Sequence, residues 1–230
     1  MIRKIAFQNE YFYHIFNRGV DKRRIFNSNH DYTRFMENIR DFNNTLTDAQ
    51  RKHLKSKSAS KSNLSVSDTD ESVSDTERWR GSVKPLVEII CYSLLTNHFH
   101  FLLRQLSDDG ITCFMRKLSG GYTNYFNLKN ERSGHLFQGA FKAVPVETDE
   151  QLLYLSAYVN GNVEIHKIAK AEDWEWGSYK DYIGKRNGTL CNKKIILAEF
   201  KHIKDYQKYV KIVIKESGQR KEEVNKYELD

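Results

Sequence analysis

The sequence has few cysteines and no long hydrophobic run. Its three cysteines, Cys91, Cys113 and Cys191, are odd in number and far apart, so neither a disulfide framework nor a paired-cysteine zinc site follows from them. The longest apolar stretches, near 87–95 and 99–103, are much shorter than the ~20 residues that a transmembrane helix needs. The first residues lack the apolar block of a signal peptide. We therefore expect a reduced, cytoplasmic protein.

Acidic residues do not dominate either. The 230 residues include 37 Lys and Arg against 30 Asp and Glu, a net charge of +7. The segment 185–230 has 12 basic and 7 acidic residues and therefore contributes +5. A basic chain most simply binds a polyanion, commonly nucleic acid, although such charge also serves ordinary solubility. Hydrophobic residues are 39% of the chain, enough for a core, which excludes wholesale disorder.

Strand-like and helix-like segments alternate along the chain. The pattern predicts strands at 11–17, 87–95, 98–104 and 136–146, and helices at 31–44, from 108 and from 149. The second and third strands are separated by a short turn and form a predicted hairpin. This order predicts an α+β fold of the split-βαβ kind, in which an antiparallel sheet carries its helices on one face.

A serine-rich segment interrupts this pattern. Residues 48–83 hold almost no large apolar side chain, are basic in their first half and are acidic in their second half. Such a segment cannot repay its ordering entropy by burial, so we expect a flexible insertion inside a domain. The predicted organisation is a domain at 1–184 that contains this insertion, followed by a basic, largely helical extension at 185–230.

The tripeptide His98-Phe99-His100 carries the strongest chemical signal. Residues i and i+2 of a strand point to the same face, so the two imidazoles project together while Phe99 points into a core. Two neutral imidazoles side by side are a start for a divalent-cation site, which needs further ligands from elsewhere. The alternative is two polar residues on the wet face of a strand, which the periodicity explains equally well.

A second pair lies on the helix that begins near 149. Tyr158 and Asn162 are four residues apart, so they share one helix face, one turn apart. A phenol there could attack phosphorus while the amide oxygen completes a metal shell. The alternative, a tyrosine at the buried edge of an amphipathic helix, is favoured by the spacing alone.

These features together resemble the HUH-superfamily single-tyrosine transposases, which act on single-stranded DNA, especially the group associated with repetitive extragenic palindromes (REP). The resemblance spans roughly 11–184. Its motifs are His-Ile-Phe-Asn-Arg-Gly (14–19), Asp-Tyr-x-Arg-Phe (31–35), Asn-His-Phe-His-Phe-Leu-Leu (97–103), Gly-His-Leu-Phe-Gln-Gly (134–139), Phe-Lys-Ala (141–143), Leu-Leu-Tyr-Leu-Ser-x-Tyr (152–158) and Trp-x-Trp-x-Ser-Tyr (174–179).

The resemblance implies a ferredoxin-like HUH core and a set of residue roles. His98, His100 and Asn162 would hold a divalent metal, Mg²⁺ or Mn²⁺. Tyr158 would attack a DNA phosphate to give a 5′-phosphotyrosine link and a free 3′-hydroxyl, a step that can later reverse on another DNA end. The expected partner is single-stranded or hairpin DNA, and a homodimer is an option because the family contains both dimers and monomers.

Some positions depart from the family pattern. Val163 stands where relatives often have Pro, and Ala140 stands where many have Arg. The register is also open, because aligning Asn160 in place of Asn162 would put Ser156 at the nucleophile position. Tyr154, one turn before Tyr158, is the next candidate nucleophile.

Single-strand binding pairs cations for the backbone with aromatic faces for the bases. Arg18, Arg116, Lys117 and Lys142 lie next to the predicted site elements in the sequence and are the expected phosphate contacts, although each taken singly is better explained as a solvated charge. The basic segment 185–215 is a further candidate for DNA binding, since it could contact the stem of a DNA hairpin.

Other functions fit parts of this pattern. A sheet-faced nucleic-acid-binding module stacks bases on sheet aromatics, but it has no need for two imidazoles at its centre. A replication-initiator or relaxase-type nickase would share the core chemistry, and the motif order favours the transposase group over it. A domesticated, non-catalytic relative stays open because of Val163 and Ala140.

Overall fold

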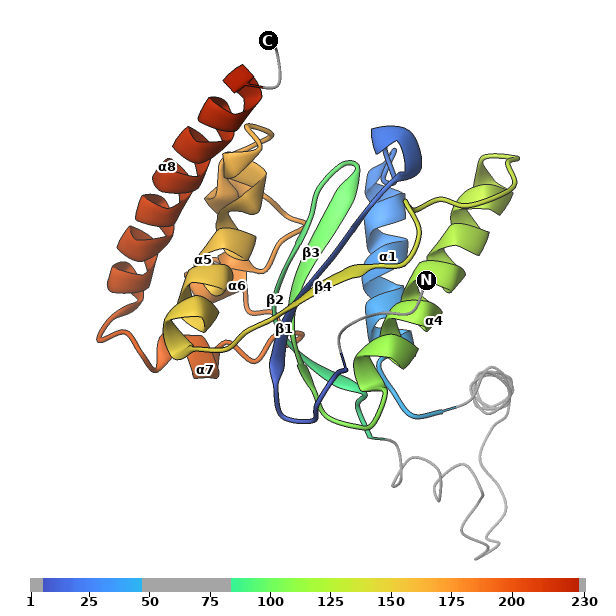
Figure 1. Cartoon of the computed structure of the whole chain (residues 1–230). Helices are drawn as coiled ribbons and strands as arrows, with labels where there is room; N and C mark the ends of the chain where they lie inside the picture. Colours follow the sequence, from blue (N-terminus) through green and yellow to red (C-terminus); the bar gives the residue numbers. More distant parts are fainter. Residues whose placement is uncertain (1–5, 47–83, 228–230) are drawn as a thin grey trace, which may run out of the picture.

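The computed structural model describes residues 6–46 and 84–227 (Figure 1). The predicted insertion at 48–83 lies outside the described residues. Strand β1 (Phe12–Arg18), the hairpin of β2 (Val87–Leu94) and β3 (His98–Gln105), and the short β4 (Lys142–Pro145) form one four-stranded sheet. The strand order is β2-β3-β1-β4 and every neighbouring pair is antiparallel. The predicted α+β class with an antiparallel sheet is confirmed.

Helices connect and follow the strands. Three long helices and the hairpin lie where the sequence pattern predicts them, and short helical turns occupy the segments between. The helices are α1 (Asn29–Phe42), α4 (Gly110–Lys129), α5 (Asp149–Ile165), α6 (Tyr179–Tyr182), α7 (Lys194–Leu197) and α8 (Ile203–Tyr227), with 3₁₀ turns η1 (Val20–Lys22) and η2 (Ala171–Asp173). Among the described residues, no helix is both long and apolar enough to span a membrane.

The helices form two layers, one on each side of the sheet (Figure 1). Helices α1 and α4 cover one face, where Phe99 and Phe101 pack against Phe35 in one core cluster. Helices α5 and α8 cover the other face, where Leu102 and Val159 belong to a second core cluster. The structure therefore differs from the expectation of helices on one face. The reason is that Ile90, Cys91 and Leu102 of the sheet are buried on this second side, so that face also needs a covering layer.

The C-terminal helix α8 holds α5 against the sheet. Tyr206, Val210 and Val213 of α8 are buried in the second core cluster. Gly161 of α5 lets the two helices approach closely, because a Cβ atom there would lie 2.5 Å from Cγ1 of Ile214 on α8. The division of the chain at residue 184 stays a prediction, and the structure adds that α8 packs directly on α5.

This contact gives a stability prediction. Gly161→Ala should lower the free energy of unfolding by about 1–3 kcal/mol, because the added methyl group overpacks the α5–α8 contact. The matched control is Gly120→Ala on α4, where a Cβ atom meets nothing within 4 Å. That change should raise stability by up to ~1 kcal/mol through helix propensity. Urea denaturation measures both, and equal stabilisation by the two changes would contradict this packing.

Candidate active site

A cavity of about 560 Å³ lies between the sheet and α5. The sheet contributes its β1, β3 and β4 side chains to the floor, α5 contributes the roof, and the loop before β4 closes one side. The lining residues are Phe16, Asn17, Arg18, His98, His100, Gln138, Ala140, Lys142, Tyr158 and His166. Most of the polar residues that the sequence singled out therefore meet in one cavity.

The two histidines of β3 share one face of the strand. Their ring centroids are 5.2 Å apart, and both side chains are buried rather than solvated. On the opposite face of the strand, Phe99 and Phe101 lie in the first core cluster. The alternation of β3 thus sends the aromatic residues toward α1 and α4 and the imidazoles toward α5.

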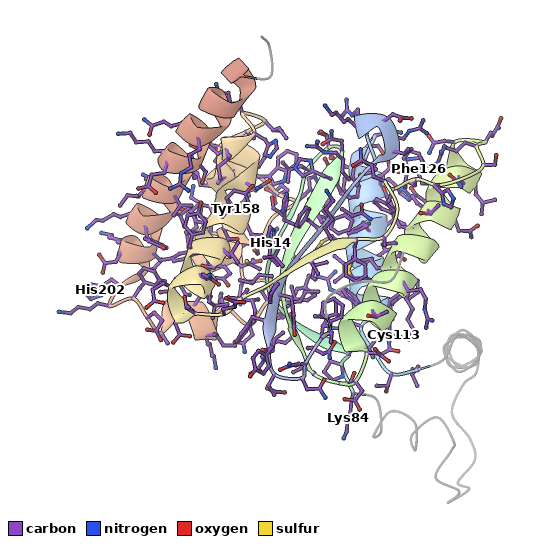
Figure 2. The ribbon with its side chains drawn as sticks, in the orientation of Figure 1. His14, Lys84, Cys113, Phe126, Tyr158 and His202 are labelled. Atoms are coloured by element: carbon purple, nitrogen blue, oxygen red, sulfur yellow. The ribbon has the colours of Figure 1, made fainter. Side chains whose placement is uncertain are left out.

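Tyr158 faces these imidazoles from α5. Its ring centroid lies 6.0 Å from that of His100 and 6.1 Å from that of His14, with the rings edge-on in both cases. Figure 2 shows Tyr158 on the helix layer and His14 on the sheet beside it. Burial raises the pKa of the Tyr158 phenol, and the Asn162 side chain partly offsets that shift. The phenol is therefore neutral until something in the site stabilises its charged form.

The structure separates the candidate nucleophiles. The Ser156 hydroxyl donates to the backbone oxygen of Leu153 and contacts the Tyr206 hydroxyl at 3.4 Å, so it faces α8. The Tyr154 hydroxyl lies 3.2 Å from Oγ of Ser217, also on α8. Of these three positions, Tyr158 alone lines the cavity with the histidines.

The two asparagines of α5 have different surroundings. Asn160 donates from Nδ2 to the Tyr206 hydroxyl at 2.7 Å and accepts at Oδ1 from the Ser178 hydroxyl at 2.6 Å. It is thus a structural link among buried residues. Asn162 is fully buried, and within the described part of the chain neither of its side-chain polar atoms makes a hydrogen bond of normal geometry. Such orphaned buried groups are rare in proteins and call for an explanation.

Two histidines that the sequence analysis did not select also belong to the site. Nε2 of His14, on β1, lies 2.9 Å from Nδ1 of His100. The ring of His166, just after α5, lies 4.6 Å from the ring of His98. His166 follows Tyr158 by eight residues, on the same helix face, and this spacing was the available signal for it. His14 shares the strand face of Phe16 and Arg18, but its link to β3 depends on strand pairing.

Two imidazoles of the site have lowered pKa values. Burial lowers the pKa of His14 to about 4. The pKa of His100 lies well below its usual range, first because of burial and then because of the neighbouring imidazoles, His14 foremost. Neutral imidazole is the form that binds metals. The low pKa of these groups therefore keeps them competent as ligands at neutral pH.

The donors present fit a divalent cation through nitrogen and amide groups rather than through carboxylates. Among the described residues, no three His, Cys, Asp or Glu side chains are arranged to hold a metal ion. His98 and His100 line the cavity, whereas Asn162, one helical turn from Tyr158, is buried on α5 and is not among the residues that line it. Such a set leaves coordination positions for phosphate oxygens and water.

The four cations expected at the site fall into two groups. Arg18 and Lys142 line the cavity, and Nζ of Lys142 lies 6.0 Å from the ring centroid of Phe16. Arg116 and Lys117 lie on α4, on the other side of the sheet, and the structure does not bring them to the cavity. Lys117 donates instead to the backbone oxygens of Asn44 and Leu46.

The two departures from the family pattern have plain structural consequences. Ala140 lines the cavity, so no long side chain occupies that part of its wall. Lys142, two residues later, supplies a cation to the same cavity. Val163 is buried in the second core cluster, so it contributes to the packing of α5.

Comparison with known proteins supports the fold. The chain is similar to a solved structure described as a REP-associated tyrosine transposase bound to a REP hairpin, with a TM-score of 0.52 and 12% sequence identity. The similarity covers 83% of this chain and 89% of that one. The sequence matches no family model and no curated protein. At this identity the likeness shows that the two chains share a fold.

The contrast between the two asparagines is testable. Asn160→Ala should lower the free energy of unfolding by about 1–3 kcal/mol, because it leaves the buried hydroxyls of Ser178 and Tyr206 short of a partner. Asn162→Ala should cost less, because it removes a buried amide that lacks hydrogen bonds. Thermal denaturation of the two variants compares them directly. A larger loss for Asn162→Ala would show that Asn162 has a structural role.

Proposed function

We propose that this chain is a DNA-processing enzyme that cleaves and rejoins single-stranded DNA through a covalent bond to Tyr158. The observation that carries this proposal is the position of Tyr158, which alone among the candidate nucleophiles shares a cavity with His98 and His100. The fold, which is that of a transposase bound to a DNA hairpin, supports a DNA substrate.

The reaction is a transesterification. The phenolic oxygen of Tyr158 attacks a DNA phosphorus atom, a new P–O bond to tyrosine forms, and the bond from phosphorus to the 3′ oxygen breaks. The phenolic proton leaves to solvent and the departing 3′ oxygen takes up a proton, so the products are a 5′-phosphotyrosine and a free 3′-hydroxyl. The step conserves the number of phosphodiester bonds, so it can reverse on a second DNA end without ATP.

His98, His100 and Asn162 are the residues that would hold a divalent cation, Mg²⁺ or Mn²⁺. When bound, such a cation supplies polarisation of the target phosphate and favours the charged form of a nearby oxygen. Arg18 and Lys142 lie in the same cavity and bind phosphate oxygens by charge. Phe16 also lines the cavity and is the aromatic residue there on which a base could stack.

The arrangement disfavours a simple sheet-faced binding module. In such modules the sheet surface is open and its aromatic residues stack on bases. Here the corresponding sheet face is covered by α5, and its centre is occupied by buried imidazoles. A related nickase of the replication or relaxase type would share the chemistry, and the fold similarity favours the transposase group.

The first prediction of this proposal concerns the covalent bond. Wild-type protein incubated with end-labelled single-stranded hairpin DNA and Mn²⁺ should give an adduct that survives denaturation. Tyr158→Phe should abolish it, because the nucleophilic oxygen is lost while the ring and its packing are kept. The measurement is a denaturing gel that separates free DNA from protein-linked DNA.

Matched controls come from the same helix. Tyr154→Phe and Ser156→Ala should keep the adduct, since both hydroxyls face α8. A chelator should abolish the adduct, and His98→Ala should weaken Mn²⁺ binding in calorimetry. An adduct that persists in Tyr158→Phe would refute the nucleophile, and unchanged Mn²⁺ affinity in His98→Ala would refute the metal ligand.

A row of lysines on α8 is the second DNA contact that we propose. Lys204, Lys208, Lys211 and Lys215 follow one another at spacings of four, three and four residues, so they share one helix face. All four are exposed, and the row extends for roughly 16 Å at the rise of an α-helix. Tyr206, Val210 and Val213 on the opposite side are buried, so the lysines face away from the core.

Lys208→Gln combined with Lys211→Gln should weaken hairpin binding and make it less dependent on salt. Each lost phosphate contact reduces the slope of log affinity against log salt by ~0.9, so the pair should reduce it by about 2. The control, Arg40→Gln combined with Lys84→Gln, removes two exposed charges away from α8. Fluorescence anisotropy across a salt series measures the slope, and equal slopes for the two double variants would exclude this surface.

A further inference from the structure

The hydrogen bond at Nδ1 of His98 shows where the proton of this ring lies. Nδ2 of Asn97 donates to the backbone oxygen of Lys22 at 3.0 Å. This fixes the orientation of the amide, so its oxygen is the atom that lies 2.6 Å from Nδ1 of His98. An amide oxygen accepts and cannot donate. Nδ1 of His98 must therefore carry the proton, and in the neutral ring the lone pair is on Nε2.

His100 has a corresponding neighbour on β1. In the sheet, Phe16 pairs with His100 and His14 pairs with Leu102, so His14 and His100 are diagonal neighbours on the same face. Their ring planes are 15° apart, and Nε2 of His14 lies 2.9 Å from Nδ1 of His100. On its other side His100 stacks with Phe16, at 5.5 Å between ring centroids. These neighbours hold the ring of His100 in one orientation.

Two proton arrangements satisfy the contact between these two rings. If His14 donated from Nε2, the proton of neutral His100 would be on Nε2 and that nitrogen could not bind a metal. If His100 donates from Nδ1, the lone pair of its Nε2 is free for a ligand bond. A contact of 2.9 Å between two ring nitrogens needs one donor and one acceptor, so in neutral rings it selects one of these two arrangements.

We propose that Asn97 and His14 are positioning residues that hold His98 and His100 as the Nδ1–H tautomers, with both Nε2 lone pairs available to one divalent cation. This inference rests on the proposed function for the cation itself. The two acceptors differ in kind. Asn97, in the turn that joins β2 to β3, is anchored by its bond to Lys22, and His14 is anchored by its burial in the sheet, where it is 7% exposed.

The first experiment reads the tautomers without metal. In protein labelled with ¹⁵N at histidine, long-range proton–nitrogen correlation spectra at neutral pH distinguish Nδ1–H from Nε2–H rings. His98 and His100 should both show the Nδ1–H pattern. An Nε2–H pattern for His100 in the wild-type protein would overturn the proposal, whether or not the protein binds metal.

Two variants of His14 test the cause. His14→Phe keeps an aromatic ring but removes the acceptor, so the His100 ring should shift toward Nε2–H and Mn²⁺ affinity should fall about 10–100-fold. His14→Gln places an amide oxygen near the position of Nε2 and should restore both the tautomer and most of the affinity. His98, held by Asn97, should keep its Nδ1–H pattern in both variants and serves as an internal control for folding.

The outcomes separate this inference from the proposed function. Unchanged His100 tautomer and Mn²⁺ affinity in His14→Phe would overturn the positioning role. Wild-type protein that shows both Nδ1–H rings, shifts its tautomer in His14→Phe and yet binds no Mn²⁺ would support the positioning of the rings and refute the metal-dependent function.

Discussion

The burial of imidazole and phenol groups between the sheet and α5 is the constraint on which the rest of the site depends. An α+β sheet commonly leaves one face to solvent, and on such a face His98 and His100 would be ordinary solvated residues. Here α5 covers that face, and α8 holds α5 in place through Tyr206, Val210 and Val213. Desolvation then lowers the pKa values of His14 and His100 and raises the pKa of the Tyr158 phenol, so these three groups are in their uncharged forms.

Two regular periods place the polar groups opposite one another. The period of two along β1 and β3 puts His14, His98 and His100 on one sheet face. The helical period along α5 puts Tyr158, Asn162 and His166 on the face that looks toward them. Strand pairing then sets which groups meet, because Phe16 lies opposite His100 and Arg18 opposite His98. The site is thus assembled from rigid elements, which favours a fixed geometry.

The sequence predicted the parts of the site that depend on a single element. The shared face of His98 and His100 follows from one strand, and the spacing of Tyr158 and Asn162 follows from one helix. The pairing of His14 with His100 could not be predicted in this way, because it depends on the register between strands that are 86 residues apart at these positions. Similarly, Tyr154, Ser156 and Tyr158 could be ranked only once α8 was placed, since α8 occupies the side to which the first two turn.

The two predictions that the structure contradicts failed for the same reason, because they too depended on how separate elements pack together. Arg116 and Lys117 follow the hairpin closely in the sequence, but α4 crosses to the opposite face of the sheet, so proximity along the chain did not become proximity in space. The expectation of helices on one face failed for a related reason. The helical pattern of α5 and the helical, basic character of the extension that holds α8 could be read from the sequence, whereas the face of the sheet that these helices cover could not.

The side chain of Asn162 lowers the stability of the fold, which indicates that it serves function. A buried amide without hydrogen bonds is destabilising, and the neighbouring Asn160 shows that this helix can satisfy such a group completely with Ser178 and Tyr206. The unsatisfied amide occurs on the side that faces Tyr158, next to a phenol whose pKa is raised by burial. Both groups gain most from an added positive charge in the site. A phosphate-bearing substrate that arrives with a cation would supply interactions to both groups at once, so the free energy that the unsatisfied groups cost would be regained as binding energy.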